Sequence, residues 1–387
     1  MTSQDHHSNM TNKYSFNPLE ISFCGLSGSG KTTLIEKLAR RWSESGSHFG
    51  YIKHDAHHFD MDRPGKDTYR ITAAGAQVSI INDPARQAIL SKASNGCLAK
   101  PLLLECDFVV VEGYKDLSIP KIIMIDEAGS ILAHFRDKPA LSLLAYVGPW
   151  RVPPPMIVES LTAPYFYRDD VDAIANLVND HFKAKNAHRP LYGLVLSGGR
   201  SQRMGQDKAM LKYWGDATQL DHVAAMLHQQ CDQVFVSARQ DQIESNKDYA
   251  KHRCISDSIL DMGPLGGILS AMRKYPDAAW LVTAIDLPYL NTQTFKNLMS
   301  DRDPSRFASA YLSSNADFIE PLCAIYEPKC YPIFMTLVGL GLRCPMRILA
   351  SIRIKTMRQS NVVDELTNVN TYSEYDQVAN KRKSAHA

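Results

Sequence analysis

Two glycine-rich segments with basic residues mark the places in this chain where chemistry could occur. The first runs from Gly25 to Thr32 and reads G-x-x-x-x-G-K-T. The second runs from Leu196 to Lys208 and reads L-S-G-G-x-x-x-R-M-G-x-D-K. Glycine has no side chain, so backbone N–H groups in such turns can approach phosphate oxygens closely. Because the two patterns differ, they predict two nucleotide-binding domains of different kinds rather than a repeat.

The first segment has every part of a P-loop, a phosphate-binding turn between a strand and a helix. Lys31 can reach the β- and γ-phosphates of a nucleotide, and the Thr32 hydroxyl can bind Mg²⁺. Further along the chain, Glu112 ends the apolar stretch Phe108–Val111. It could hold the same ion or one of its waters, or it could lie in a surface turn. The residues predicted to bind nucleotide in this half are Gly25, Gly28, Gly30, Lys31, Thr32, Thr33 and Glu112, with Thr32 also a metal ligand.

Histidines are concentrated directly after the stretch Phe49–Lys53, at His54, His57 and His58, with Asp55 among them. Both residue types can bind metal ions, but this spacing fits no established zinc pattern. A polar loop at the edge of the nucleotide site is therefore favoured over a metal centre.

The second glycine-rich segment carries two cations, Arg203 and Lys208, on a predicted strand-to-helix turn. Its backbone can surround a triphosphate, and the cations can offset the charge that develops as pyrophosphate leaves; solvated charges without a role are the alternative. Asp286 follows the apolar stretch Trp280–Ala284 and could hold the Mg²⁺ that bridges the phosphates, or it could cap the next helix. The predicted catalytic residues are therefore Arg203, Lys208 and Asp286, with Asp286 the metal ligand.

Two further polar segments occur in the second half. Asp257 follows a short apolar stretch and precedes the glycine-rich turn Gly263–Gly267, which would let a helix begin close to the nucleotide. Asn368 and Asn370, in the sequence N-V-N-T, offer two side-chain amides. They either bind an acceptor molecule or form a turn before a helix.

Short apolar stretches alternate with helical spacings in both halves. This alternation predicts two open, mostly parallel α/β sheets: a P-loop NTPase-like domain, then a Rossmann-like nucleotidyltransferase domain. Ligands in such sheets bind beyond the carboxyl ends of the strands, where both glycine loops are expected. The expected strands are Ile21–Cys24, Phe49–Lys53, Gln77–Ile81, Phe108–Val111, Ile122–Ile125, Tyr192–Leu196, Gln233–Ser237 and Trp280–Ala284. The expected helices include Thr32–Ser45, Asp169–Phe182, Leu220–Gln230 and Gly266–Tyr275.

The polar segment that ends in Pro190 is predicted to separate the two domains. The expected organisation is a disordered N-terminus (1–17), a P-loop domain (18–183), a linker (184–190), a nucleotidyltransferase domain (191–380) and a basic tail (381–387). The net charge of +2 gives no indication of a nucleic-acid or membrane surface. No apolar run approaches the ~18 residues of a membrane span, and the eight cysteines form no C-x-x-C pair, which favours reduced thiols in a cytoplasmic protein.

The first half resembles the adaptor protein of molybdopterin-guanine dinucleotide biosynthesis (MobB) over roughly Glu20 to Phe182. The resemblance rests on the P-loop, on the elements K-H-x-x-H-H, P-G-K-D and A-G-A within Lys53–Ala76, and on V-E-G-Y-K at Val111–Lys115. It implies GTP binding, weak hydrolysis at most and an accessory role.

The second half resembles the molybdenum cofactor guanylyltransferase family (MobA) from roughly Tyr192 to the C-terminus. The resemblance rests on the second glycine loop, on Asp257 followed by G-P-L-x-G, on D-x-P at Asp286, and on N-V-N-T. Arg239 stands where the family often has an asparagine, which weakens the expectation of a guanine contact there. The resemblance implies nucleotide contacts at Leu196, Ser197, Gly198, Gly199, Lys208, Asp257 and Asp286.

Together the resemblances imply an adaptor–transferase fusion that joins GTP and molybdopterin, with Mg²⁺ as cofactor, and releases pyrophosphate. The implied partners are molybdoenzyme clients and other cofactor-biosynthesis proteins. A terminal phosphate oxygen of molybdopterin would attack the α-phosphorus of GTP without a general base, because the second pKa of a phosphate is about 6. The alternatives are a cytidylyltransferase or sugar-phosphate nucleotidyltransferase, and a GTP-regulated cofactor-delivery module without transferase activity.

Overall fold

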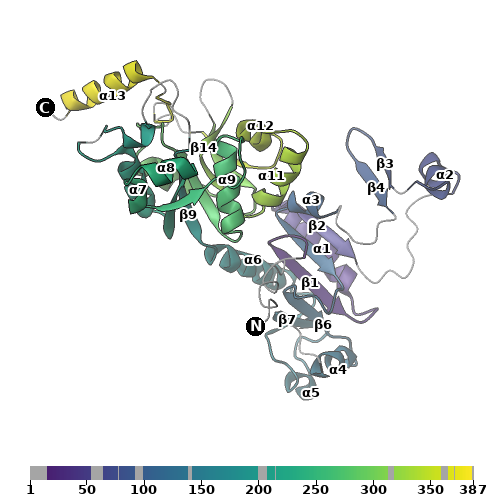
Figure 1. Ribbon diagram of the computed structural model, residues 1–387. Coiled ribbons are helices and arrows are strands. Elements are labelled where there is room, and N and C mark those ends of the chain that lie inside the picture. Colours follow the sequence, from purple (N-terminus) through teal and green to yellow (C-terminus); the bar gives the residue numbers. More distant parts are fainter. Residues whose placement is uncertain are drawn as a thin grey trace, which may run out of the picture. The chain divides into compact units, whose positions relative to one another are not determined.

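The chain forms two compact units, Met1–Asp180 and His181–Ala387, each containing its own central sheet. The computed structural model describes residues 15–53, 64–76, 78–91, 99–137, 142–198, 207–213, 215–312, 318–358, 365–369 and 371–385. Figure 1 shows strands and helices alternating along both units. The prediction of two open, mostly parallel α/β sheets is confirmed.

The first unit is built on a six-stranded sheet in the order β2-β5-β1-β6-β7-β8. Every neighbouring pair in it is parallel. The inner strands β1, β5 and β6 are buried throughout, as expected for a parallel sheet covered on both faces. The strands are β1 (Glu20–Gly25), β2 (Phe49–Lys53), β5 (Phe108–Glu112), β6 (Lys121–Met124), β7 (Leu143–Gly148) and β8 (Tyr165–Tyr167).

The strand expected at Gln77–Ile81 belongs to a separate hairpin rather than to the main sheet. It is β3 (Val78–Asn82), which pairs antiparallel with β4 (Gln87–Ser91). Ile80 and Ile81 are both 56% exposed, so the apolar run that predicts a strand here does not mark a buried one. The helices of this unit are α1 (Lys31–Glu44), α2 (Asp67–Ala73), α3 (Ala99–Leu104), α4 (Ser130–Asp137), α5 (Pro155–Val158) and the first part of α6 (Val171–Ala187), which crosses the boundary at Asp180.

The second unit contains a seven-stranded sheet in the order β11-β10-β9-β12-β14-β13-β15. The first four of these strands are parallel, whereas β14 runs antiparallel to both β12 and β13. Sequence analysis predicted β9, β10 and β12 but not β13 or β14, because Pro321 and scattered polar residues interrupt the pattern. The strands are β9 (Leu191–Leu196), β10 (Gln233–Ala238), β11 (Arg253–Ser256), β12 (Ala279–Ala284), β13 (Ala308–Leu312), β14 (Ile319–Tyr326) and β15 (Lys355–Met357).

Helices α7 and α9 of the second unit both pack against β9 and β10, so β9, which leads into the glycine loop, is a covered inner strand of the sheet (Figure 1). The helices of this unit are α7 (Gln219–His228), α8 (Gln240–Ser245), α9 (Pro264–Lys274), α10 (Thr292–Ser300), α11 (Cys330–Gly339), α12 (Pro345–Ala350) and α13 (Tyr372–Ala385), with short 3₁₀ turns η1 (Lys208–Met210) and η2 (Tyr249–Lys251).

Two segments predicted as a linker and a basic tail are largely helical. Helix α6 continues to Ala187, so it includes much of the predicted linker 184–190. Helix α13 continues to Ala385, so it includes most of the predicted basic tail 381–387. In both cases a polar composition does not prevent a helix, because lysine, arginine and alanine are good helix formers.

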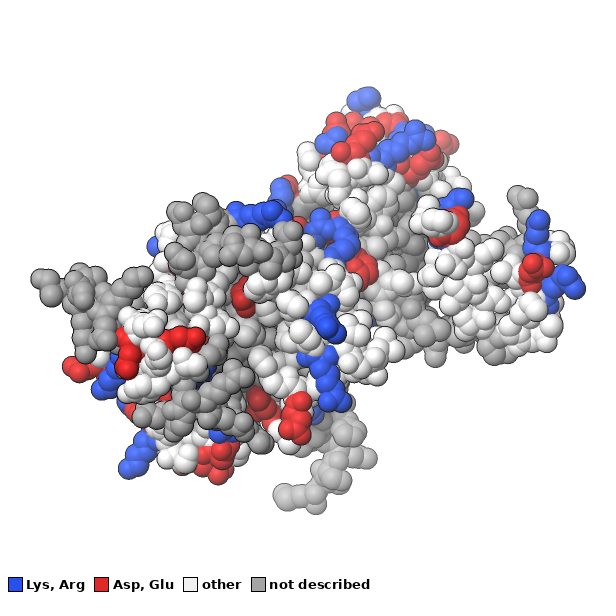
Figure 2. All heavy atoms as spheres, turned by 90° about the horizontal axis from the view of Figure 1, so that it is seen from above, with Lys and Arg blue, Asp and Glu red and all other residues white. Residues whose placement is uncertain are grey.

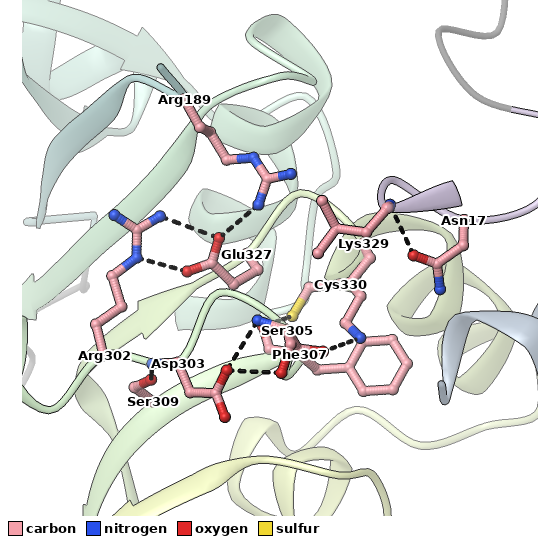
Figure 3. A network of polar contacts seen from close by, with 11 residues as sticks. Asn17, Arg189, Arg302, Asp303, Ser305, Phe307, Ser309, Glu327, Lys329 and Cys330 are labelled. Atoms are coloured by element: carbon pink, nitrogen blue, oxygen red, sulfur yellow. Dashed lines mark hydrogen bonds and ion pairs between the residues drawn. The ribbon is translucent and has the colours of Figure 1, made fainter. Parts of the chain in front are cut away.

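A buried carboxylate joins the start of the second unit to the end of β14. Glu327 is fully buried, and its Oε1 accepts a hydrogen bond from Arg302 Nε at 2.7 Å. Its Oε2 accepts hydrogen bonds from Arg302 at 3.1 Å and from Arg189 at 3.2 Å. Figure 3 shows both guanidinium groups directed at this one carboxylate. The ion pairs therefore hold the residues just before β9 to the body of this unit.

Charged side chains of both signs are interspersed on the surface. On the face drawn in Figure 2, the coloured basic and acidic residues alternate over short distances. This distribution agrees with a net charge close to zero.

Candidate nucleotide-binding sites

The P-loop of the first unit connects the carboxyl end of β1 to the start of α1. Gly28 and Gly30 have φ values of 78° and 86°, a region that favours glycine and explains these two residues in the turn. Lys31 Nζ donates to the carbonyl oxygens of Gly25 at 3.1 Å and Leu26 at 2.7 Å. The Ser29 hydroxyl oxygen is buried without a hydrogen-bond partner among the described residues. A phosphate oxygen would supply the partner that this hydroxyl needs.

The carboxylate of Glu112, which was also predicted to belong to this site, lies beside the P-loop. Both of its carboxylate oxygens lie 3.1 Å from the Thr32 hydroxyl. The Tyr51 hydroxyl donates to Oε2 at 2.7 Å, and Lys53 Nζ lies 3.6 Å from Oε1. Burial, followed by the hydrogen bond to Glu112, raises the pKa of Tyr51. The structure therefore unites Thr32 and Glu112, and it adds Tyr51, which sequence analysis did not identify as a site residue.

The second glycine loop leaves the carboxyl end of β9 and returns at η1. Leu196 and Ser197 are buried at its start, and Asp207 accepts a hydrogen bond from Ala209 N at its end. Gly199 and Arg203, predicted here from the sequence, lie outside the described residues, as do the histidines of His54–His58.

Four polar residues, which we call the stem network, connect the two ends of this loop. The Tyr249 hydroxyl lies 2.7 Å from Ser197 Oγ and donates to Asp207 Oδ2 at 2.9 Å. Gln242 Nε2 donates to the same carboxylate oxygen at 3.0 Å and lies 3.3 Å from the Ser197 carbonyl oxygen. Burial raises the pKa of Tyr249, so its hydroxyl stays a hydrogen-bond donor. The network of Ser197, Asp207, Gln242 and Tyr249 holds both loop ends at a set spacing.

Lys208, Asp286 and Val369 meet beside this loop, from three distant parts of the chain. Lys208 Nζ donates to the Val369 carbonyl oxygen at 2.9 Å and lies 3.4 Å from Asp286 Oδ2. The Val369 amide donates to the Asp286 carbonyl oxygen at 2.9 Å. The structure thus brings together two of the predicted catalytic residues and the backbone of the N-V-N-T segment.

The second carboxylate oxygen of Asp286 suits a cation. Oδ1 is buried and has no hydrogen-bond partner among the described residues, and a divalent ion prefers such an oxygen ligand. The alternative that Asp286 caps the next helix is wrong, because Asn291 caps α10 with hydrogen bonds from the amides of Gln293 and Thr294.

The N-V-N-T segment also begins a helix. Thr371 and Glu374 exchange hydrogen bonds between side chain and backbone at the start of α13, which is the arrangement of a capping box. Asn368 is exposed just before buried Val369, and Asn370 lies outside the described residues. The prediction of a helix start is confirmed, and an acceptor contact through Asn368 and Asn370 stays a prediction.

Asp257 lies on the other side of the glycine loop. Ser237 Oγ donates to its Oδ1 at 3.0 Å. Burial raises the pKa of Asp257, against the opposing effects of Ser237 and Arg239. A Cβ on Gly198 would lie 3.5 Å from Asp257 Oδ2, and a Cβ on Gly267 would lie 2.3 Å from Ser237 Oγ. Helix α9 therefore approaches Ser237 only because residue 267 has no side chain.

Arg239, the departure from the family pattern, contacts the glycine loop itself. One guanidinium nitrogen donates to the Gly198 carbonyl oxygen at 2.9 Å. The guanidinium group also pairs with Asp241 through bonds of 3.0 and 3.1 Å. This arginine thus contributes to the position of the first loop glycine.

The fold and these two loops define a protein with two nucleotide-binding α/β units. The family model for molybdopterin guanine dinucleotide synthesis protein B matches residues 20–147, and the model for the MobA-like NTP transferase domain matches residues 193–356. The chain belongs to both families, with a MobB-like first half fused to a MobA-like second half.

Three curated relatives agree with this assignment. A molybdenum cofactor biosynthesis bifunctional protein of Synechocystis is 34% identical over 51% of this chain and 56% of its own length. A probable molybdopterin-guanine dinucleotide biosynthesis adapter protein of Bacillus subtilis is 31% identical over 43% of this chain and 95% of its own. A probable molybdenum cofactor guanylyltransferase of Mycobacterium bovis is 32% identical over 40% of this chain and 76% of its own. The match to the bifunctional relative thus spans little more than half of that protein.

Across the parts of the chain that the structure describes, no helix combines the length and the apolar composition needed to cross a membrane.

Proposed function

We propose that the second unit is a molybdenum cofactor guanylyltransferase, which joins GTP and molybdopterin into molybdopterin guanine dinucleotide and pyrophosphate. The meeting of Lys208, Asp286 and Val369 beside the glycine loop carries this proposal. It supplies a cation, a carboxylate with an unpaired oxygen and a nearby acceptor segment at the carboxyl ends of parallel strands, where α/β sheets bind ligands.

The reaction is a direct transfer between phosphates. A terminal phosphate oxygen of molybdopterin forms a bond to the α-phosphorus of GTP, and the bond from that phosphorus to the oxygen of the β-phosphate breaks. Pyrophosphate leaves with the electron pair of the broken bond. The attacking oxygen is already anionic near neutral pH, so the protein contributes orientation and charge rather than a general base.

The chain's own residues have separate parts in this transfer. The glycine loop, held at both ends by the stem network, orients the triphosphate with its backbone amides. Lys208 reduces the negative charge around the leaving pyrophosphate, and Asp257 contacts the nucleoside side of GTP. Asp286 would hold a divalent ion, proposed as Mg²⁺, which supplies additional charge stabilisation when bound.

The first unit is proposed to be a GTP-binding adaptor in the same cytoplasmic pathway. Its Thr32 and Glu112 are 3.1 Å apart, close enough to share one Mg²⁺ or its water. Molybdoenzymes and other proteins of cofactor biosynthesis are its proposed partners, because the similar proteins are named for their part in that biosynthesis.

Pyrophosphate release by the full chain tests the proposed transfer. The protein is mixed with molybdopterin and Mg²⁺, and GTP, CTP and ATP are compared at equal concentrations. We expect release with GTP at a rate well above the other two. Faster release with CTP would indicate a cytidylyltransferase. Absence of release with every nucleotide, together with retained GTP binding, would favour a delivery module.

A further inference from the structure

We propose that a group of tyrosines beside the transfer site binds the flat ring of the acceptor's pterin. This tyrosine cluster consists of Tyr213, Tyr289, Tyr372 and Tyr375. The proposal rests on the proposed function, because it assigns the ring-binding part of the same acceptor site.

The cluster begins where the transfer site ends. Val369 accepts the hydrogen bond from Lys208 and donates one to Asp286. The same residue packs in a buried group with Tyr213 and Val378, against which Tyr289 and Tyr375 also pack. Val369 therefore contacts both the residues proposed to act on the phosphates and the tyrosine cluster.

The rings extend from the protein interior to its surface. Tyr213 is buried, its ring centroid lies 4.9 Å from that of Tyr375, and Tyr375 lies 5.6 Å from Tyr372. Tyr372 is 52% exposed. Buried Tyr213 explains how α13 is attached, but attachment does not require an exposed ring at position 372. Exposed tyrosine rings are the surfaces on which flat heterocycles stack.

The order of the strands separates this cluster from the guanosine side of the site. In the sequence β11-β10-β9-β12, the glycine loop follows β9. Asp257 follows β11 on one side of that loop, and Asp286 follows β12 on the other. GTP that contacts Asp257 and Gly198 therefore directs its guanosine away from the tyrosines. The reaction involves two flat ring systems, the guanine of GTP and the pterin of the acceptor. Since the guanine lies on the other side of the loop, the pterin is the ring that the tyrosine cluster can bind.

The chemistry of the acceptor agrees with this placement. Molybdopterin carries its phosphate on a short chain attached to a reduced pterin, and the pyrimidinone part of that pterin is planar. When the phosphate of molybdopterin lies at Lys208, the short chain keeps the pterin ring near that lysine, on the side of the tyrosine cluster.

Binding of a reduced pterin without a phosphate, 6-methyltetrahydropterin, tests the cluster directly. Its affinity for the full chain loaded with GTP and Mg²⁺ is measured by calorimetry. We expect Tyr372→Ala and Tyr375→Ala each to weaken binding about tenfold, a typical loss for one stacking ring. Tyr375→Phe, which keeps the ring, should remain within about twofold of the original chain on the same reasoning.

Tyr331→Ala, on α11 outside the cluster, is the matched control and should bind the pterin normally. GTP affinity should be unchanged in all of these variants. Normal pterin affinity in both alanine variants would overturn the proposal, and so would undetectable binding by the original chain or an equal loss of GTP affinity. Pyrophosphate release by the original chain is measured in parallel. If the original chain releases pyrophosphate but the alanine variants bind the pterin normally, this inference alone is refuted. If the alanine variants lose pterin affinity but the original chain releases no pyrophosphate, the transferase proposal alone is refuted.

Discussion

Replacing Tyr249 by phenylalanine tests whether the stem network prepares the glycine loop for GTP. The change removes one hydroxyl and keeps the ring, so it creates no large cavity. That hydroxyl contacts Ser197 Oγ at 2.7 Å and donates to Asp207 Oδ2 at 2.9 Å. Asp207 keeps its bonds from Gln242 and from the amide of Ala209. Gln242 Nε2 also donates to the Tyr249 hydroxyl at 3.2 Å, but it keeps Asp207 as an acceptor. The main loss is therefore the connection through Tyr249 between the two loop ends.

The expected loss of stability is estimated from the contacts of the Tyr249 hydroxyl with Ser197 and Asp207. A neutral hydrogen bond contributes about 1 kcal/mol and a bond to a carboxylate about 2 kcal/mol, so the second unit should lose about 3 kcal/mol of stability. GTP binding must restore the spacing of the loop ends. If about half of the loss appears there, the KM for GTP rises about tenfold, which corresponds to about 1.4 kcal/mol.

Hydrogen exchange read by mass spectrometry measures the stability of the second unit separately, from peptides that cover β9 and β12. Pyrophosphate release at varied GTP gives KM. Tyr311→Phe is the matched control, because this buried tyrosine donates at 2.7 Å to the Thr294 carbonyl oxygen. It should lose about 1 kcal/mol and keep its KM. If Tyr249→Phe changes KM no more than Tyr311→Phe does, the stem network has no role in GTP binding.

Three further predictions concern charged residues. Lys208→Ala should lower kcat for transfer about 10²–10³-fold with an unchanged circular dichroism spectrum; near-normal turnover would exclude its charge role. Lys31→Ala should abolish binding of fluorescent GTP to the first unit while basal pyrophosphate release continues, and a folded but inactive variant would contradict this separation. Because burial raises the pKa of Asp257, its ionised form destabilises the folded chain above that pKa. The penalty fades as pH falls through the folded pKa and is absent below the unfolded value, 3.8. Asp257→Asn should therefore be more stable than the original at pH 7 and equally stable at pH 3, as measured by thermal unfolding.

The parts of the site that the sequence predicted are those that follow strands. Thr32 and Glu112 are 80 positions apart, but Thr32 lies in the first turn of the helix that follows β1, Glu112 is the last residue of β5, and β1 and β5 are direct neighbours. Lys208 and Asp286 likewise follow the neighbouring strands β9 and β12, Lys208 after the glycine loop and Asp286 two residues after the strand ends. A glycine pattern or an acid at a strand end is visible in the sequence, and parallel pairing then brings such residues to one edge.

The remaining parts carry no such signal. Tyr51 lies within an ordinary strand, and Tyr249 and Gln242 lie on short elements without a motif, so only the folded chain shows which polar groups they meet. Val369 acts through its backbone, which every residue has. The antiparallel half of the second sheet was missed because Pro321 argues against a strand. Pro321 precedes Cys323, the first residue of β14 that pairs with β12, so the proline breaks no hydrogen bond of that pairing.

The close approach of Gly267 to Ser237 requires that residue 267 have no side chain. A methyl group at residue 267 would overlap the Ser237 hydroxyl, which holds Asp257. Even Gly267→Ala would therefore shift the Asp257 carboxylate, although the Ser237 side chain lies between the two residues. Variation at this buried glycine is therefore expected to move Asp257, the residue proposed to contact the nucleotide, although residue 267 itself lies against Ser237.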